Sequence, residues 1–214
     1  MWRPVGRRWG AWLAALGLSL LLLAGCGGVA PVVKIGLVAP FEGAHRAVGY
    51  DAIYAARLAV REINAAGGVG GYRVALVALD DSGDVKRARQ AAASLTLDPM
   101  VVAVVGHWLT ETTAVAAPIY AAAGLPLLAA GRAPLGETPP AQLPPAFRAA
   151  YAAVTPFEET TGVYAGTTYD AFQLLFTALD HAAAAGPVDR AAVTAALVNL
   201  QIAGITGPIY QPPP

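Results

Sequence analysis

The chain has 214 residues, of which 56% are hydrophobic and 13% are charged, so it can bury one sizeable core in one or two domains. Its 14 basic and 14 acidic residues cancel. Without the three arginines nearest the N-terminus, 11 basic residues stand against 14 acidic ones, and the balance is mildly acidic with no basic stripe. This charge pattern excludes a nucleic-acid platform.

The N-terminus has the pattern of a targeting segment. Arg3, Arg7 and Arg8 form a positive region, and Ala11 to Leu23 is an apolar stretch too short for a comfortable transmembrane span. The following Leu23-Ala24-Gly25-Cys26 resembles a bacterial lipobox. The resemblance implies a lipoprotein signal peptide over residues 1–25, acylation of Cys26, a tether over residues 26–31 and membrane anchoring outside the cytoplasm. An ordinary signal peptide or an uncleaved anchor is the alternative.

Cysteine usage limits the chemistry of the folded part. Cys26 is the only cysteine and stands at the processing site. The folded chain therefore has no disulfide, no thiolate metal site and no cysteine nucleophile. Lipid attachment is therefore the favoured role of the Cys26 thiol.

The folded chain is expected to begin at Val32 with a buried strand to Ala39, a loop over Pro40 to Gly49 and a helix over Tyr50 to Ala66. The glycines within Gly67 to Gly71 invite comparison with a nucleotide-binding loop. They follow a helix and precede a strand, however, whereas a phosphate-binding loop follows a strand and opens a helix. We therefore predict a helix C-cap and chain reversal here.

The second strand is predicted over Tyr72 to Leu79 and ends in Asp80-Asp81-Ser82-Gly83-Asp84. Clustered carboxylates after a strand can hold Mg²⁺. A helix with apolar residues at helical spacing follows at once, over Val85 to Leu97, and Asp84 is placed to cap it. Capping and turn formation are favoured over metal binding.

The stretch from Val101 to Arg132 is the clearest in the chain. Val101 to Val105 is an apolar, largely β-branched strand, a helix starts near Thr110 with the Thr110 hydroxyl as its cap and stops at Gly124, and Leu125 to Ala130 forms the next strand. Four strands thus alternate with three helices, which predicts an α/β fold with a doubly wound parallel sheet. The turn from His107 to Thr110 lies where a ligand usually binds in such sheets.

The remaining chain is predicted to be mainly helical. Residues 133–145 form a Pro-rich connector, and helices are expected over Ala146 to Val154, Thr167 to Ala185 and from Asp189, as cap, to about Asn199. The final GPIYQPPP suggests no regular element.

Residues for catalysis are scarce, so we predict no enzyme, no cofactor and no metal. Outside the signal segment the only serines are Ser82 and Ser94, neither within a GxSxG elbow, and the three histidines are dispersed along the sequence. No GxGxxG follows the first strand. His107 has no carboxylate or second histidine beside it in the sequence, so we expect it to shape its loop.

Two long segments carry a family resemblance. VKIGLVAPFEGAHRAVGYDAIYAARLAVREINAAGGVGGYRVALVALDDSGD and VVGHWLTETTAVAAPIYAAAGLPLLAAG resemble the first lobe of type I periplasmic solute-binding proteins of the branched-chain amino-acid group. TTYDAFQLLFTALDHA and ITGPIY are similar to the late helix and closing segment of the same family. Between the first two segments and the last two, members of the family have an entire second lobe. This chain has only the Pro-rich connector in that place. The resemblance therefore implies a single lobe over residues 32–214, made of 32–132 and 146–214.

The resemblance also implies capture of an amino acid or similar small polar solute for the permease subunits of an ABC importer. An α-carboxylate would meet the Thr110 hydroxyl and the N–H groups from Thr110 to Thr112, beside Leu109. Trp108 would form an apolar wall, and the loop from Phe41 to Gly49 would close one side. Ala130 and Arg132 would offer backbone groups, and Arg132 stands where the family commonly has a small hydroxyl residue, which allows a second acidic group on the ligand.

Two alternatives remain open from the sequence. Thr110 can be only a cap while Trp108 only packs. The whole chain can instead be a lipid-anchored sensor or interaction module, or the remnant of a binding protein, that no longer delivers solute. A homodimer or partner protein could supply the second wall that a single lobe lacks.

Overall fold

The computed structural model describes residues 29–129 and 135–210. The predicted signal segment with Cys26, and the predicted site residues Ala130 and Arg132, lie outside the described residues. The described residues from Pro31 onward belong to one compact unit. In the described part, every helix is too short or too polar to cross a membrane.

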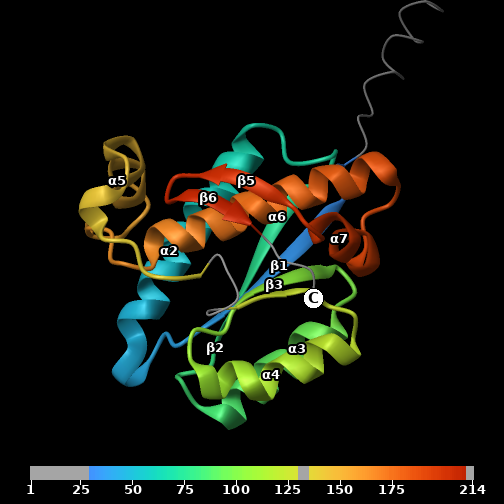
Figure 1. The fold of residues 1–214 in the computed structure, drawn as a ribbon, viewed down its shortest axis with the longest axis horizontal. Coiled ribbons are helices and arrows are strands. Elements are labelled where there is room, and N and C mark those ends of the chain that lie inside the picture. The colour runs from blue at the N-terminus through green and yellow to red at the C-terminus, as the bar shows by residue number, and fades with distance from the viewer. Residues whose placement is uncertain (1–28, 130–134, 211–214) are drawn as a thin grey trace, which may run out of the picture. The chain divides into compact units, whose positions relative to one another are not determined.

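The centre of the fold is a four-stranded parallel sheet in the order β2-β1-β3-β4 (Figure 1). The strands are β1 (Val32–Ala39), β2 (Arg73–Asp80), β3 (Val101–Gly106) and β4 (Leu127–Leu128). The inner strand β3 is buried along its whole length, as its apolar sequence requires. This topology confirms the predicted doubly wound parallel sheet.

Helices cover both faces of the sheet (Figure 1). One core cluster joins the sheet to α2 (Arg46–Ala65) and α6 (Ala165–Ala185), and a second joins it to α3 (Val85–Leu97) and α4 (Thr110–Ala122). Shorter helices complete the fold: η1 (Gly43–His45), η2 (Pro140–Gln142), α5 (Pro145–Ala152) and α7 (Arg190–Leu197).

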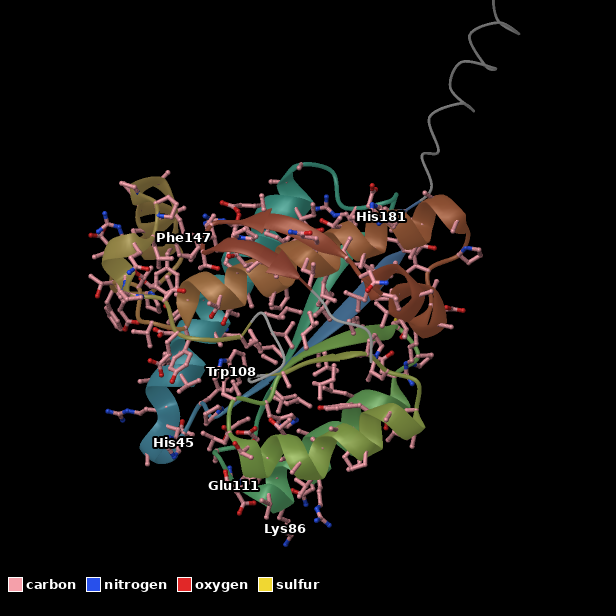
Figure 2. All side chains as sticks on the ribbon, in the orientation of Figure 1. His45, Lys86, Trp108, Glu111, Phe147 and His181 are labelled. Atoms are coloured by element: carbon pink, nitrogen blue, oxygen red, sulfur yellow. The ribbon has the colours of Figure 1, made fainter. Side chains whose placement is uncertain are left out.

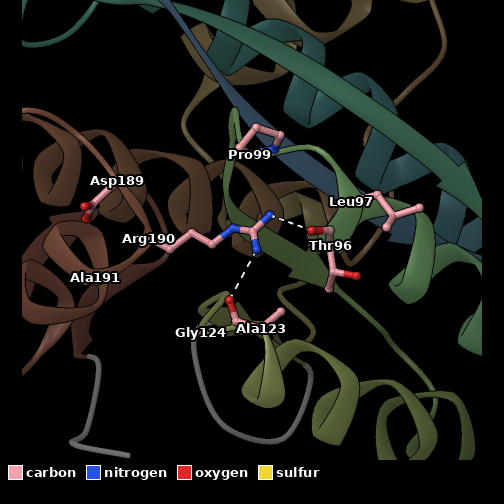
Figure 3. Close-up of a pocket in the computed structure, with 8 residues that line it drawn as sticks. All are labelled: Thr96, Leu97, Pro99, Ala123, Gly124, Asp189, Arg190 and Ala191. Carbon is pink, nitrogen blue, oxygen red and sulfur yellow. Dashed lines mark hydrogen bonds between the residues drawn. The ribbon is translucent and has the colours of Figure 1, made fainter.

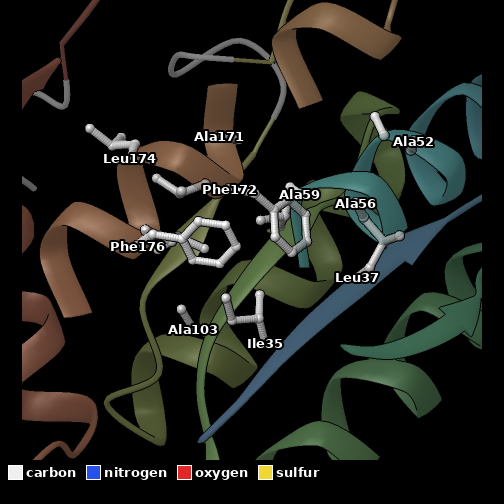
Figure 4. Close-up of a cluster of buried hydrophobic side chains, with 14 of the residues drawn as sticks. Ile35, Leu37, Ala52, Ala56, Ala59, Ala103, Ala171, Phe172, Leu174 and Phe176 are labelled. Atoms are coloured by element: carbon white, nitrogen blue, oxygen red, sulfur yellow. The ribbon is translucent and has the colours of Figure 1, made fainter. Parts of the chain in front are cut away.

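Small residues let the helices approach the sheet closely. Ala52, Ala56 and Ala59 on α2 are fully buried. Opposite them, Phe172 and Phe176 of α6 meet edge to face with ring centroids 6.1 Å apart (Figure 4). Methyl groups on one helix thus leave room for aromatic rings on the next, and both belong to the same buried cluster.

Several predicted boundaries were wrong. The helix α2 begins four residues before Tyr50, and β4 has two residues where six were predicted. The helix α5 ends at Ala152. The C-terminal segment was predicted to be irregular, yet β5 (Gln201–Gly204) and β6 (Gly207–Tyr210) form an antiparallel hairpin.

The predicted aspartate caps are confirmed. The Asp84 carboxylate accepts hydrogen bonds from the N–H groups of Lys86 and Arg87 at 3.0 and 2.9 Å, and Asp189 accepts from Ala192 at 2.8 Å. Both satisfy donors that a helix start leaves free. The glycines after α2 reverse the chain as predicted, with positive φ at Gly67 and Gly68.

The side chain of Arg190 joins α7 to the amino ends of the strands (Figure 3). Its guanidinium donates to four carbonyl oxygens, those of Thr96, Asp98, Val101 and Ala123, at 2.9 to 3.2 Å. Two of these carbonyls lie at the C-terminal ends of α3 and α4, where a cation offsets the helix dipole. Arg190 therefore stabilises the end of the sheet opposite the predicted site.

The described part of the Pro-rich segment packs against the rest of the fold. Leu135 and Leu143 are buried, and the Thr138 N–H donates to the Val163 carbonyl at 2.8 Å. Farther along, the N–H groups of Gly162 and Tyr164 both donate to the Asp51 carboxylate at 3.1 Å. Burial raises the pKa of Asp51, while these two hydrogen bonds act to lower it. Buried leucines and a backbone hydrogen bond thus hold residues 135–145 against the fold, although their composition suggested only a spacer.

Candidate functional site

The loops that follow β1, β2 and β3 meet at the carboxyl edge of the sheet. A Cβ added to Gly83 would lie 2.9 Å from a Leu109 methyl and 3.5 Å from the His45 ring, so the three loops touch at this glycine. Figure 2 shows His45, Trp108 and Glu111 on the same side of the molecule. This edge is the usual ligand position in an open parallel sheet.

Gly106 ends β3 and brings the next turn close to β1. Its φ is +121°, and a Cβ there would lie 2.1 Å from the Val38 carbonyl oxygen. Only glycine fits a backbone that approaches so closely in this conformation. The turn from His107 to Leu109 is therefore held against the end of β1.

Asp80 ties the first two loops together. Its carboxylate accepts hydrogen bonds from the Phe41 N–H at 2.8 Å and from the N–H and hydroxyl of Ser82 at 2.8 and 2.5 Å. Partial burial acts to raise the pKa of Asp80, but the hydrogen bonds from Ser82 and Phe41 outweigh it and lower the pKa. This carboxylate serves the loops, in agreement with the turn-forming role that the sequence favoured over metal binding.

A buried polar network, unexpected from the sequence, underlies the candidate turn. His107 Nδ1 lies 2.6 Å from Asp81 Oδ2, and His107 Nε2 lies 3.3 Å from the Tyr120 hydroxyl. Asp81, His107 and Tyr120 are each 0% exposed. Burial and the Asp81 charge raise the pKa of Tyr120, so its hydroxyl stays protonated. The expectation that His107 has no carboxylate was wrong, because Asp81 reaches it from the loop after β2.

This network favours a positioning role for His107. The ring donates from Nδ1 to the Asp81 carboxylate, and its Nε2 shares a hydrogen bond with the Tyr120 hydroxyl on α4. Asp81 also accepts from the Gly83 N–H at 2.9 Å. Fully buried and bonded on both ring nitrogens, His107 links the loop after β2 to the turn after β3, as the loop-shaping hypothesis predicts.

The prediction that the Thr110 hydroxyl caps α4 was wrong. Leu109 occupies the cap position, Thr110 is the first helical residue, and no side chain caps the helix. Two later threonines fix the turn instead: Thr112 Oγ1 donates to the Leu109 carbonyl at 3.0 Å, and Thr113 Oγ1 donates to the His107 carbonyl at 3.1 Å. The exposed Thr110 hydroxyl and the first N–H groups of α4 remain available to a ligand.

Trp108 belongs to this turn, and its side chain is buried, with 8% exposed. Its ring belongs to the core cluster formed with α2 and α6. Its Nε1 is buried and has no acceptor among the residues that the structure describes. A buried donor without a partner is costly, so this N–H is a second feature of the turn that suits a ligand acceptor.

Four predicted ligand residues therefore occur together on one turn. Trp108 is buried, Leu109 is half-buried, Thr110 is exposed, and Thr112 is buried with its hydroxyl already bonded. No group of three or more potential metal-ligating side chains occurs in residues 29–129 and 135–210. What the turn offers is hydrogen-bond donors, which favour an anionic or acceptor-rich solute.

Comparison with known proteins supplies an independent result. A family model described as periplasmic binding protein matches residues 32–148. An amino acid binding protein of Pseudomonas aeruginosa is 37% identical over 93 residues, which cover 44% of this chain and 25% of that protein. The Leu/Ile/Val-binding protein homolog 1 of Brucella abortus is 31% identical over 110 residues, covering 51% of this chain and 29% of that protein.

A solved structure is similar in fold over most of the chain. The solute-binding protein of an ABC transporter from R. palustris, crystallised with benzoate, aligns with a TM-score of 0.63 over 83% of this chain and 88% of that chain, at 11% identity. The alignment shows a shared fold. The chain spans less than a third of the length of the two curated relatives.

Proposed function

Since the chain belongs to the periplasmic binding protein family, which binds rather than transforms its ligands, we propose that it is a one-lobed, extracytoplasmic solute-binding component of an ABC importer. The observation that carries the proposal is the turn at the carboxyl edge, where the uncapped start of α4 and the unpaired Trp108 N–H provide donors. Permease subunits are the implied partners, and no residue in the site calls for a cofactor.

An amino acid is the proposed solute class. The partial positive charge at the start of α4 favours a carboxylate, and the first N–H groups of the helix point along its axis toward such an anion. The exposed Thr110 hydroxyl adds a donor at the same position. The names of the relatives, amino acid binding and Leu/Ile/Val-binding, support branched-chain amino acids as the first solutes to test.

A single lobe should bind weakly. In a two-lobed binder the ligand gains contacts from both sides, and closure excludes water and strengthens each hydrogen bond. Losing one side removes a few contacts of about 1 kcal/mol each, so a micromolar site would fall to about millimolar. A partner or second copy over the Trp108 turn would restore the enclosure.

We expect titration calorimetry of the mature chain with leucine, isoleucine, valine and polar amino acids to show about millimolar binding. Thr110→Ala should weaken it several-fold by removing one donor, about 1 kcal/mol. Trp108→Phe keeps an aromatic ring but removes the N–H together with part of the buried indole, so weaker binding by this variant would support a site beside Trp108. Thr194→Ala on α7, far from the edge, is the matched control. Micromolar binding that neither site variant changes would reject both the half-site argument and the choice of residues.

The lipid anchor is a separate proposal, supported by the order of positive region, apolar stretch and Leu-Ala-Gly-Cys. Cys26→Ser should move the protein from the membrane fraction to the soluble fraction, because the acylated thiol would be lost. Mass spectrometry of the N-terminal peptide should find an acyl group on Cys26 only in the natural chain. A natural chain without acyl mass, and equal membrane association of both proteins, would reject the anchor.

A sensor or interaction module that no longer delivers solute is the second candidate, favoured by the connector that occupies the place of a second lobe. Such a module needs no permease. Neighbouring permease genes and solute-dependent uptake would favour import, whereas their absence together with intact membrane anchoring would favour the module.

A further inference from the structure

One edge of the sheet is open. Among the described strands, β2 has a single neighbour, β1, and its other side faces outward. Leu76, Val77 and Leu79 are only partly buried, and Ala78 is exposed. The strand reads RVALVALD and, between its charged ends, lacks the lysine, proline or inward charge that usually protects an edge.

The hydrogen bonds of the strand show which residues face outward. The Arg73 N–H donates to the Pro31 carbonyl at 2.8 Å, and the Asp81 N–H donates to the Ala39 carbonyl at 3.2 Å. Backbone groups alternate sides along a strand, so odd-numbered residues face β1. The N–H and C=O groups of the even-numbered residues between Val74 and Asp80 therefore face away from the sheet.

One outward position is already occupied. The Asn64 side chain donates to the Val74 carbonyl at 2.7 Å and accepts from the Val74 N–H at 3.0 Å. The Asn64 amide thus makes the two hydrogen bonds that a neighbouring strand would make to Val74, so no strand can pair at Val74. Leu76 and Ala78 keep their outward groups without a partner in the described part of the chain.

We propose that β2 pairs antiparallel with β2 of a second copy of this chain, about a two-fold axis through Val77. In this register Leu76 of each copy lies opposite Ala78 of the other, and each pair exchanges two backbone hydrogen bonds. Val77 meets its own equivalent, and Ala75 meets Leu79. Large side chains thus face small ones, and the same edge serves both copies, as a closed two-fold interface requires.

The neighbouring registers fit less well. A two-fold axis through Leu76 places Ala78 opposite Val74, whose backbone groups Asn64 already holds. An axis through Ala78 places Leu76 opposite Asp80 and Ala75 opposite the buried Asp81. The axis through Val77 is the one of the three that pairs the two free residues with each other. It sets Asp80 opposite Val74, whose backbone groups Asn64 holds, so the hydrogen-bonded ladder ends at the two pairs of Leu76 with Ala78.

The pairing would create one continuous sheet of eight strands. The carboxyl edges of the two copies point in opposite directions, so neither copy covers the ligand turn of the other. The inference therefore does not depend on the proposed solute-binding function.

A cysteine scan tests the register. In the mature chain with Cys26→Ser, the only thiol is the one introduced. Val77→Cys should form a disulfide-linked dimer under mild oxidation, because facing residues in a non-hydrogen-bonded pair lie about 4.5 Å apart at Cα. Ala75→Cys and Leu79→Cys are the matched controls, since each would lie about 13 Å along the strand from its own equivalent, beyond the reach of a disulfide. Equal cross-linking at all three positions, or at 76 or 78 in place of 77, would overturn the register.

Sedimentation equilibrium tests the pairing without a cross-link. The Cys26→Ser chain should show a mass that rises with concentration toward that of a dimer, and Ala78→Lys should abolish the rise by adding a charge to the exposed centre of the edge. Ala93→Lys, on the exposed face of α3, should leave it unchanged. Circular dichroism should show that both variants are folded. A monomer mass at every concentration, or equal association of both lysine variants, would overturn the proposal.

Discussion

Asp81→Ala is expected to lower the free energy of unfolding by about 3 kcal/mol, the scale for losing a buried hydrogen bond to a charged group and leaving its donor unpaired. The carboxylate bonds His107 Nδ1 at 2.6 Å and the Gly83 N–H at 2.9 Å, and the site is closed to water. The variant leaves both donors without an acceptor. Urea unfolding at neutral pH measures the loss.

Asp84→Ala is the matched control for this prediction. Asp84 belongs to the same acidic segment, but its carboxylate is exposed and only caps α3, so its loss should cost about 1 kcal/mol. Asp81→Asn should be intermediate, since the amide retains one acceptor oxygen. Equal losses for Asp81→Ala and Asp84→Ala would show that the buried pair with His107 contributes nothing beyond turn formation.

Asp170→Ala is expected to lower the free energy of unfolding by a similar amount, about 3 kcal/mol. This fully buried carboxylate on α6 accepts from the N–H groups of Ile205 and Thr206, at 2.8 and 2.9 Å, and from the Thr206 hydroxyl at 2.5 Å. It holds the turn between β5 and β6 against the helix. Hydrogen exchange should therefore show loss of protection concentrated in the hairpin.

Asp180→Ala controls for the loss of a carboxylate from α6, because Asp180 is exposed, and its effect should be within about 0.5 kcal/mol. A second test uses Gly204, where an added Cβ would lie 2.5 Å from the Asp170 carboxyl group. Gly204→Ala should therefore be less damaging in the Asp170→Ala background than in the natural chain. Additive losses would contradict the close contact.

The candidate turn was located from sequence because its signals are local. An apolar strand, a glycine and the start of a helical period predict a strand-turn-helix unit, and parallel sheets bind ligands at that junction. The predicted cap at Thr110 failed by one residue, because Leu109 adopts the extended conformation of the cap while Thr112 and Thr113 bond back to the turn. Such one-residue choices depend on packing below the turn.

The C-terminal hairpin was missed because no local signal marks it. Ile202 and Ile209 pair across strands of four residues each, too short for a periodic pattern. The partner that holds the turn, Asp170, lies 35 residues earlier within an otherwise apolar helix face. The residues around Asp170 in the sequence predict that it lies on a helix, but they do not indicate that its carboxylate accepts hydrogen bonds from the β5–β6 turn.

The sequence by itself determined the strands of the parallel sheet, the helices between them and their order, because hydrophobic period and glycine position act over a few residues. Only the tertiary structure decided which polar groups meet. Asp81 and His107 are 26 residues apart, and Arg190 reaches carbonyl groups up to 94 residues away. A buried charge or donor must find its partner wherever the fold brings one, and that partner follows from the packing of whole elements rather than from any local pattern.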